Sequence, residues 1–331
     1  MIDSLAGRLT TYLKFVKWYF NYKKGRKAPI FASYNVTYRC NLRCSFCYAY
    51  NNLYPELNTR DSIEVIEQIC ELGVPLLDFS GGEPFLRPDL EALALRAKEY
   101  GCMTSVNTNG TLINEQRAKK AAKAFDYVTV SIDGPSEFHD KVRGVKGTYE
   151  KAMRGIRLLK RENVKVGIGS VILPENLELL IEMIPDLIDD VDYITVQPVY
   201  PPPLLTSPKL NELIDLLIDI KRRKPSFIPL PNAYISGISD YFEGRMSKVC
   251  DAISLYFSIS PNGEVLACGA RNDIVLGNIF EKRLKDILSD PPKEAVVKVS
   301  ECKGCWLDCT VGVSLSIRRP IEVVKSYIGL S

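Results

Sequence analysis

The stretch FASYNVTYRCNLRCSFCY, residues 31–48, joins a short strand-like run to three closely spaced cysteines. Residues 31–36 predict a strand, and the loop after it carries Cys40, Cys44 and Cys47 with the spacing C-x3-C-x2-C. Thiolates are the usual ligands of iron–sulfur clusters. A cubane cluster has four irons, so three cysteines leave one iron open to a substrate or a cofactor.

Further along the chain, short runs rich in Val and Ile alternate with helical patterns up to about residue 200. The expected strands are residues 31–36, 76–80, 104–107, 127–132, 165–172 and 193–196, and the expected helices are residues 62–72, 89–100, 114–124, 148–162 and 176–188. Short continuous strands suit a parallel sheet buried on both faces, and strict alternation implies right-handed crossovers. The sequence therefore predicts an α/β fold, a partial (β/α)6 barrel like a TIM barrel, with ligands at the carboxyl ends of the strands.

Polar motifs follow several of these strands directly. They are Ser80-Gly81-Gly82-Glu83-Pro84, Asn107-Thr108-Asn109-Gly110, Ser131-Ile132-Asp133-Gly134 and His139-Asp140-Lys141-Val142-Arg143-Gly144. Each motif taken alone is more often a plain turn than a site. Because the carboxyl ends of parallel strands meet at one edge, their succession predicts a shared ligand site there.

The first cysteine group, with an aromatic residue before its last cysteine, resembles the signature of the radical S-adenosylmethionine (SAM) superfamily, and the resemblance covers roughly residues 30–310. It implies that Cys40, Cys44 and Cys47 hold a 4Fe–4S cluster whose open iron is chelated by SAM. One electron then cleaves SAM to methionine and a 5′-deoxyadenosyl radical, which takes a hydrogen atom from the substrate. The residues expected to bind SAM are Phe46, Gly81, Gly82, Glu83, Asn109, Ser131 and Arg143. Among them, Glu83 would accept the SAM amine and Arg143 would pair with a carboxylate.

A second cysteine group lies near the carboxyl end of the chain. Its members are Cys250, Cys268, Cys302, Cys305 and Cys309. The group resembles the SPASM extension, or its shorter twitch form, which carries auxiliary 4Fe–4S clusters. Its five cysteines are fewer than the seven of a full SPASM extension, so we expect one auxiliary cluster on Cys250, Cys268 and two or three of the others. A structural zinc site is the alternative.

Composition restricts the function classes. The chain has 331 residues, a net charge of +3, ten cysteines and a single histidine, His139. The charge is too small to favour nucleic acid binding, and no apolar run is long enough to cross a membrane. We expect a cytoplasmic protein, where metal is a better reason than disulfides for so many cysteines. Cys70 and Cys102 are predicted to be small buried hydrophobes and His139 to be structural.

Three domains are predicted. Residues 1–29 form an amphipathic helix, residues 30–230 the barrel, and residues 231–331 the auxiliary cluster domain; residues from about 201 to 245 are rich in proline and predict one helix. The apolar face of the first helix includes Leu5, Leu9, Tyr12, Leu13, Val16, Tyr19 and Phe20, with Phe15 and Trp18 off that stripe and a basic end of Lys23, Lys24, Arg26 and Lys27. Such a helix either docks on the barrel or lies on the inner surface of a membrane.

Two function classes remain open. In the first, the chain is a radical SAM enzyme whose auxiliary cluster transfers electrons. A partner such as ferredoxin or flavodoxin would reduce the enzyme. Its substrate would be a lipid or lipid head group, which the first helix favours, or else a peptide or a tetrapyrrole, as in related enzymes. In the second, the chain is a non-catalytic iron–sulfur electron carrier, which the open iron disfavours. The sequence identifies neither the substrate nor the catalytic residues.

Overall fold

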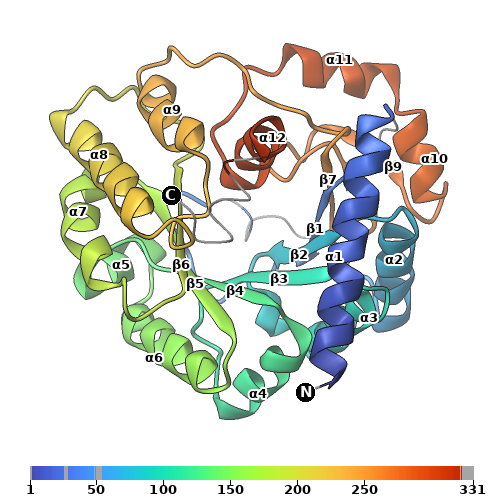
Figure 1. Cartoon of the computed structure of the whole chain (residues 1–331), viewed down its shortest axis with the longest axis horizontal. Helices are drawn as coiled ribbons and strands as arrows, with labels where there is room; N and C mark the ends of the chain where they lie inside the picture. The colour runs from blue at the N-terminus through green and yellow to red at the C-terminus, as the bar shows by residue number, and fades with distance from the viewer. Residues whose placement is uncertain (1, 26–28, 48, 50–53, 321, 323–331) are drawn as a thin grey trace.

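The computed structural model describes residues 2–25, 29–47, 49, 54–320 and 322, and of residues 2–12 it describes the backbone alone (Figure 1). Of the residues predicted for the first helix and its basic end, the side chains of Leu5, Leu9 and Tyr12, together with Arg26 and Lys27, therefore lie outside the described part of the chain.

Six parallel strands form the sheet that the sequence predicts. They are β1 (Phe31–Thr37), β2 (Leu76–Gly81), β3 (Met103–Thr108), β4 (Tyr127–Ser131), β5 (Lys165–Ile172) and β6 (Tyr193–Pro198). They are paired in sequence order, each parallel to the next, and the sheet stays open instead of closing between β6 and β1 (Figure 1). The predicted partial barrel is confirmed.

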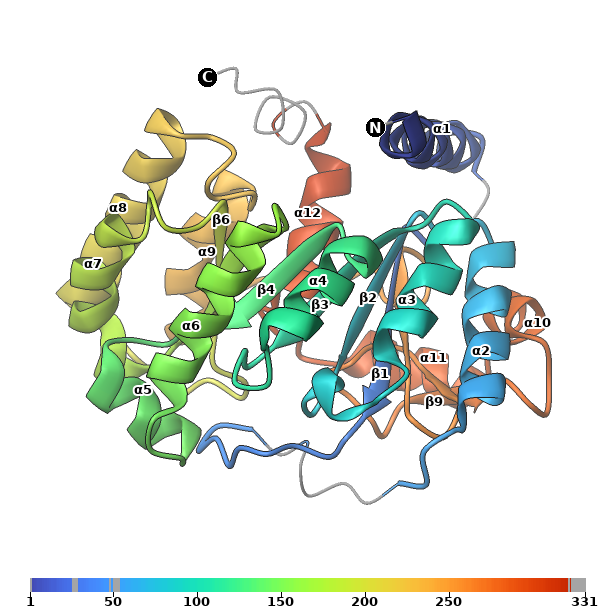
Figure 2. The same cartoon turned by 90° about the horizontal axis from the view of Figure 1, so that it is seen from below.

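Helices connect the strands and cover the outside of the sheet (Figure 2). They are α2 (Thr59–Glu71), α3 (Leu90–Glu99), α4 (Glu115–Ala124), α6 (Thr148–Arg161) and α7 (Leu177–Asp186), with short 3-10 turns η2 (Pro84–Leu86) and η3 (Pro174–Asn176). Side-chain caps mark two of the starts: Asn58 accepts from the N–H of Asp61 before α2, and Asn114 from that of Arg117 before α4. These helices agree with the predicted ranges to within a few residues.

Between residues 30 and 245, two of the described helices were not predicted. α5 (Ser136–Arg143) occupies the segment taken as a loop motif after β4. Residues 201–245 hold two helices, α8 (Pro208–Arg223) and α9 (Asn232–Phe242), so the prediction of one helix there is wrong. α9 was missed because its sequence is poor in strong helix formers. The helix buries Tyr234, Ile235 and Ile238, so packing stabilises it in place of propensity.

The second cysteine region shares the barrel's sheet. β7 (Tyr256–Ile259) pairs parallel with β1, opposite Phe31 to Tyr34, and is followed by the antiparallel strands β8 (Glu264–Leu266) and β9 (Val275–Asn278). The remaining elements are α10 (Leu284–Ser289), α11 (Lys293–Glu301), the π-helical turn η4 (Asp308–Gly312) and α12 (Val313–Arg318). The predicted domain boundary at residue 231 remains a prediction.

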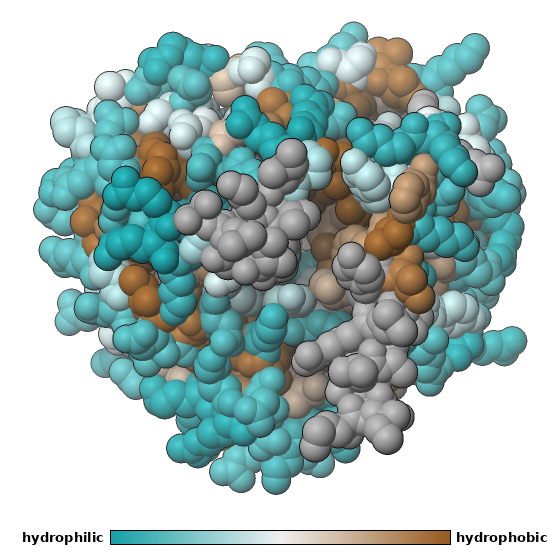
Figure 3. Space-filling model, viewed as in Figure 1, coloured by the Kyte–Doolittle hydropathy of each residue, from teal (hydrophilic) through white to brown (hydrophobic). Residues whose placement is uncertain are grey.

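The first helix, α1 (Ile2–Lys23), contacts the barrel through a face that the sequence did not predict. Trp18 is only 4% exposed and packs with Phe31, Leu255 and Tyr256, whereas Leu13 is 56% and Phe20 60% exposed. The predicted apolar stripe of α1 is therefore turned partly to the outside, and hydrophobic residues appear on this part of the surface (Figure 3). Within the described residues, no helix has the length and hydropathy needed to span a membrane.

Candidate functional site

The first cysteine loop follows β1 and is held in place by the end of α5. The N–H of Arg43 donates to the carbonyl of Arg143 at 3.1 Å, and that of Ser45 to the carbonyl of Val142 at 2.8 Å. Gly144 ends α5 with φ of +75°, and a side chain there would meet the carbonyl of Arg43. The unpredicted helix α5 is thus a support for the cysteine loop.

The three thiols of this loop line one small cavity of about 180 Å³. The Cys40 sulfur accepts a hydrogen bond from the N–H of Leu42 at 3.4 Å, and the Cys47 sulfur accepts one from the N–H of Ala49 at 3.5 Å. Burial raises the pKa of the Cys40 and Cys44 thiols. Backbone N–H groups aimed at the sulfurs suit thiolates that ligate a cluster, because such hydrogen bonds stabilise the negative charge.

Gly81 and Gly82 bring the end of β2 against the backbone of the cysteine loop. The N–H of Gly82 donates to the carbonyl of Thr37 at 2.7 Å, and that of Glu83 to the carbonyl of Arg39 at 2.8 Å. A Cβ on Gly82 would lie 2.2 Å from the carbonyl oxygen of Arg39. Gly81 and Gly82 were predicted to bind SAM. In the structure their backbone lies against the cysteine loop, and both glycines also line the small cavity that holds the three thiols.

Glu83 is fully buried and joins two strand-end loops. Its carboxylate accepts from the Thr108 hydroxyl at 2.7 Å and from the N–H groups of Asn109 at 2.8 Å and Phe85 at 3.1 Å. Burial raises the pKa of Glu83 against the effect of these donors. With these three donors the carboxylate fixes the loop after β3 against the loop after β2, while its predicted contact with the SAM amine stays a prediction.

Asn109 and Ser131 both reach the small cavity. The Asn109 amide donates to Asn41 at 2.8 Å, in the cysteine loop, and its oxygen accepts from the hydroxyl of Thr111 at 2.7 Å. Ser131 ends β4 and lines a second, larger cavity as well. The structure therefore brings these two predicted residues together with the cysteine loop.

Arg143 is buried, and its partner lies within the chain. Its Nε donates to Asp133 Oδ2 at 2.7 Å, its Nη1 lies 3.8 Å from the Cys44 sulfur, and its guanidinium lies over the Phe46 ring at 5.2 Å. Arg143 was predicted to bind SAM; the structure pairs its guanidinium with Asp133, and its contact with SAM stays a prediction. Arg143 and Phe46 both line the small cavity next to Cys44.

Asp133 is the main residue of this site to which the sequence gave no role. Its other oxygen accepts from the N–H of Val171, its carbonyl from the amide of Asn176, and its own N–H donates to Nδ1 of His139. Its place two residues after Ser131 in a strand-end motif was a signal for it. His139 is buried and structural, as expected, and burial and the charge of Arg143 lower its pKa to about 4.

The larger cavity, of about 370 Å³, is hereafter called the chamber. Residues of both cysteine regions line it, including Phe46 and Cys47 from the first and Gly269 and Cys309 from the second. Two carboxyl groups, the buried Asp78 on β2 and the half-buried Asp308 in η4, also belong to its lining. Space common to both cysteine regions allows one molecule to meet chemistry from both.

The two chamber carboxyl groups sit among hydroxyl and amide donors. Asp78 accepts from the Ser105 hydroxyl at 2.6 Å and from the Asn107 amide at 2.9 Å, and burial raises its pKa to about 7. Asp308 accepts from the N–H of Cys309 at 2.7 Å, and burial raises its pKa too. Among the described residues that line the chamber, Arg143 is the one basic side chain, and Asp133 already pairs with it.

Four thiols of the second cysteine group lie near one another. Cys250, Cys268 and Cys309 pack against the same aromatic cluster, beside β7. Burial and the nearby charges of Cys305 and Cys250 raise the pKa of Cys268 to about 12. Burial likewise raises the pKa of Cys309, with contributions from Asp308, Cys305 and Cys268. Cys250, Cys268, Cys305 and Cys309 thus form one neighbourhood.

Cys302 also lies near this group: burial, with the charges of Cys250 and Cys302, raises the pKa of Cys305. Nη1 of Arg271 lies 3.6 Å from the Cys302 sulfur. In the described part of the chain, no three His, Cys, Asp or Glu side chains converge as they would on a single metal ion. The cysteines of a cubane cluster surround four irons instead of one ion, so their sulfurs stand further apart.

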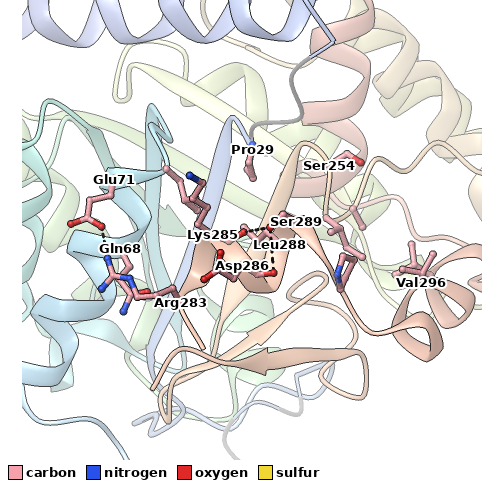
Figure 4. Close-up of a pocket in the computed structure, with 15 residues that line it drawn as sticks. Pro29, Gln68, Glu71, Ser254, Arg283, Lys285, Asp286, Leu288, Ser289 and Val296 are labelled. Carbon is pink, nitrogen blue, oxygen red and sulfur yellow. Dashed lines mark hydrogen bonds and ion pairs between the residues drawn. The ribbon is translucent and has the colours of Figure 1, made fainter. Parts of the chain in front are cut away.

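A further cavity, of about 730 Å³, has no cysteine in its lining and lies between α2, α10 and residues 252–254 (Figure 4). Arg283 reaches Glu71 across it at 2.6 Å, and the N–H of Leu284 donates to Gln68 at 2.9 Å. These contacts tie the second cysteine region to the barrel, and none of the strand-end motifs belongs to this cavity.

Comparison with known proteins places both cysteine groups in described families. The radical SAM superfamily model matches residues 34–187, and the SPASM iron–sulfur cluster-binding domain model matches residues 250–310. Together these imply a 4Fe–4S cluster, SAM and auxiliary iron–sulfur binding. The chain is 41% identical over 155 residues to an Fe-coproporphyrin III synthase of Methanosarcina barkeri, a match that covers 46% of this chain and 39% of that protein. The chain thus matches less than half the length of that relative.

Longer matches are to proteins that act on peptides. The chain is 28% identical over 276 residues to a PqqA peptide cyclase of Granulibacter bethesdensis, covering 78% of this chain and 73% of that protein. SuiB of Streptococcus suis, solved with SAM, has the same fold, with a TM-score of 0.67, 20% identity and coverage of 82% of this chain and 68% of that one. These names agree with the peptide and tetrapyrrole alternatives of the sequence analysis better than with its preference for a lipid.

Proposed function

The chain belongs to the radical SAM superfamily and carries a SPASM domain, and from this premise we propose that it cleaves SAM reductively and takes a hydrogen atom from a substrate held in the chamber. The observation that carries the proposal is the chamber itself, because residues of both cysteine regions line it. A substrate there can meet SAM chemistry on one side and an electron acceptor on the other.

In this proposal Cys40, Cys44 and Cys47 hold the SAM-cleaving cluster. When bound, a reduced 4Fe–4S cluster supplies the electron that splits SAM into methionine and a 5′-deoxyadenosyl radical. Gly81, Gly82, Asn109, Ser131 and Phe46 line the SAM site, since all of them reach the small cavity beside the thiols. Glu83 and Asp133 position this lining through their buried hydrogen bonds. A ferredoxin or flavodoxin is the proposed source of the electron.

We assign the auxiliary cluster to Cys250, Cys268, Cys305 and Cys309, the four thiols that share one neighbourhood. We leave Cys302 as the spare cysteine: its sulfur accepts from Arg271, and its charge acts on Cys305, whereas the thiols that act on Cys268 and Cys309 belong to the other four. With four protein ligands the cluster has no open iron, which favours electron transfer over direct binding of substrate. The net reaction is then an oxidation.

The proposed substrate is a peptide. The match to a peptide cyclase covers 78% of this chain, against 46% for the Fe-coproporphyrin III synthase. SuiB, which shares the fold, was also solved with its precursor peptide SuiA. The chamber supports this substrate class as well, since Asp78 and Asp308 can accept N–H groups of a peptide.

A tetrapyrrole is the second candidate, because the identity to the Fe-coproporphyrin III synthase is the higher of the two. Its carboxylates would meet Asp78 and Asp308 in the chamber, and the one described basic side chain of the lining, Arg143, is already paired. The cost of taking the tetrapyrrole's carboxylates out of water would then be offset by no free cation of the described lining. We therefore place this candidate below the peptide.

The test of the reaction is anaerobic incubation of the reconstituted protein with SAM and dithionite. We expect 5′-deoxyadenosine and methionine from the wild type, none from Cys44→Ala, and continued SAM cleavage by Cys268→Ala. No 5′-deoxyadenosine from wild-type protein with a full iron content would instead favour an electron carrier.

The test of the substrate offers two probes to the same preparation: iron-coproporphyrin III and a short peptide encoded beside the gene. The proposal expects the peptide to lose two hydrogens, seen as a mass decrease of about 2 Da, as expected when a substrate radical passes an electron to an auxiliary cluster. Conversion of the porphyrin with no change in the peptide would overturn the peptide assignment.

We also propose that α1 rests on an anionic membrane surface. Leu13 and Phe20 are exposed on it, the exposed basic residues Lys17 and Lys23 lie on the same helix, and exposed Lys24 follows directly. Apolar side chains flanked by lysines suit a helix in the interface of a membrane that carries negative lipids.

Flotation with vesicles of equal parts phosphatidylglycerol and phosphatidylcholine tests this contact. The double variant Leu13→Ser/Phe20→Ser should float several-fold less than the wild type, because burial of a large apolar side chain stabilises by about 2 kcal/mol. The matched control is Leu204→Ser, since Leu204 is 83% exposed elsewhere on the molecule. Equal flotation of the wild type and the double variant defeats the membrane proposal.

A further inference from the structure

Cys70 and Cys102, the two cysteines outside both cluster regions, lie in contact. Cys70 is on α2, and Cys102 immediately precedes β3. Their sulfur atoms are 3.2 Å apart, and both residues are buried. The prediction that they are merely small buried hydrophobes missed this contact, because 32 residues separate them in the sequence.

A lysine from α1 completes the arrangement. Lys14 Nζ lies 3.2 Å from the Cys102 sulfur and 3.4 Å from the carbonyl of Val74, while the Cys102 sulfur is 3.2 Å from that same carbonyl. The hydrogen bond from Cys70 and the charge of Lys14 lower the pKa of Cys102 to about 7. The hydrogen bond to Cys102, together with burial, raises the pKa of Cys70. One sulfur is therefore suited to be a thiolate and the other remains a thiol.

The pair lies at the end of the barrel opposite the SAM site. Cys102 and Val74 come just before β3 and β2, whereas the strand-end motifs follow these strands at Gly81 and Thr108. Chemistry at this pair is thus separate from the chamber and from both proposed clusters.

We propose that Cys70 and Cys102 are a redox-active pair that hydrogen peroxide converts into a disulfide. The Cys102 thiolate attacks one peroxide oxygen: an S–O bond forms, the O–O bond breaks, and hydroxide leaves and is protonated to water. Cys70 then attacks the Cys102 sulfur, so that an S–S bond forms and the S–O bond breaks with release of a second water. The two thiols are oxidised by two electrons, and the peroxide is reduced by two.

The geometry favours this pair over a single oxidised cysteine. A thiolate next to a cation is the reactive form of cysteine, and a second sulfur in contact resolves the sulfenic acid before further oxidation. The sulfurs must approach by only about 1 Å to reach bonding distance, since a disulfide is about 2 Å long.

The experiment treats the anaerobic holoprotein with one equivalent of hydrogen peroxide, blocks free thiols with N-ethylmaleimide, and maps tryptic peptides by mass spectrometry. Trypsin places the two cysteines in separate peptides, residues 61–96 and 99–117. We expect these peptides to become linked, with a mass about 2 Da below their sum, before the clusters lose their visible absorbance. Both peptides recovered with free, alkylated thiols while the clusters bleach would overturn the proposal.

Three variants separate the roles in this pair. In Cys70→Ser, Cys102 should stop at a sulfenic acid that dimedone traps, and in Cys102→Ser, Cys70 should not react. Lys14→Met should slow the linkage at neutral pH by about threefold or more, because the Cys102 thiolate loses its cation. Equal rates for Lys14→Met and wild type would remove Lys14 from the mechanism, and equal dimedone labelling of the two cysteine variants would refute the assignment of Cys102 as the nucleophile.

Discussion

Asp133 and Arg143 form an ion pair that is almost completely buried beside the first cysteine loop. Arg143 lies over Phe46 and near the Cys44 sulfur, so the pair sets the position of one wall of the proposed SAM site. A buried charge that loses its partner is costly, because no water replaces it.

Replacing Asp133 with Asn should therefore lower the free energy of unfolding by about 3–5 kcal/mol, the usual cost of breaking a buried pair. Urea denaturation under anaerobic conditions measures this. The control is Asp219→Asn, whose partners Arg222 and Arg223 are exposed and which should cost less than about 1 kcal/mol. Equal losses in the two variants would show that the Asp133 pair does not stabilise the fold.

His139 gives a pH dependence whose sign is fixed by its lowered pKa. Its pKa falls from 6.5 to about 4 in the folded chain, so between these values the unfolded chain binds the proton and the folded chain does not. Stability should thus decrease as the pH falls from 6.5 towards 4, by up to about 3 kcal/mol from this residue. Urea denaturation at several pH values measures the free energy of unfolding, which should fall less steeply between pH 6.5 and 4 in His139→Gln than in the wild type. The same pH dependence in both proteins would contradict the lowered pKa.

At the level of residues, the sequence identified the groups that carry the chemistry better than the groups that hold them. The three cysteines, Asn109 and Ser131 stand in motifs and reach one cavity. The contact of Arg143 with Asp133 could not be predicted, because it depends on α5 turning back towards β4. The pairing of Cys70 with Cys102 depends in the same way on how α2 packs beside β3.

At the level of elements, the alternation of strands and helices predicted the barrel, because each strand is a short buried run and each crossover helix has one apolar face. α5 was missed since it is short and lies in a motif that resembles a loop. The close approach of β2 to the cysteine loop was also beyond the sequence, although the Gly81-Gly82 pair marked the place.

Gly82→Ala tests that approach. Its Cβ would lie 2.2 Å from the Arg39 carbonyl oxygen, closer than any normal contact, so the cysteine loop must move. We expect the variant to retain about four irons per chain, those of the auxiliary cluster, and to lose SAM cleavage. Iron analysis and a 5′-deoxyadenosine assay measure the two effects, and a variant with full iron and wild-type cleavage would contradict the role of this contact.

At the level of the whole molecule, one sheet links the two cysteine regions. β7 pairs with β1, so the second region is built directly onto the strand that leads into the first cysteine loop. This junction explains how two groups more than 200 residues apart come to line one chamber. The sequence predicted both groups but not the pairing of β7 with β1, because short strands such as β7 and β8 carry little periodic signal.

The central claim is that one chain holds two clusters, one on Cys40, Cys44 and Cys47 and the other on Cys250, Cys268, Cys305 and Cys309. Iron, sulfide and zinc counts on anaerobically reconstituted protein test it most directly. The account predicts about eight irons in the wild type and in Cys302→Ser, and about four in Cys305→Ser. About four irons with one zinc in the wild type, or a loss of iron in Cys302→Ser with none in Cys305→Ser, would contradict it.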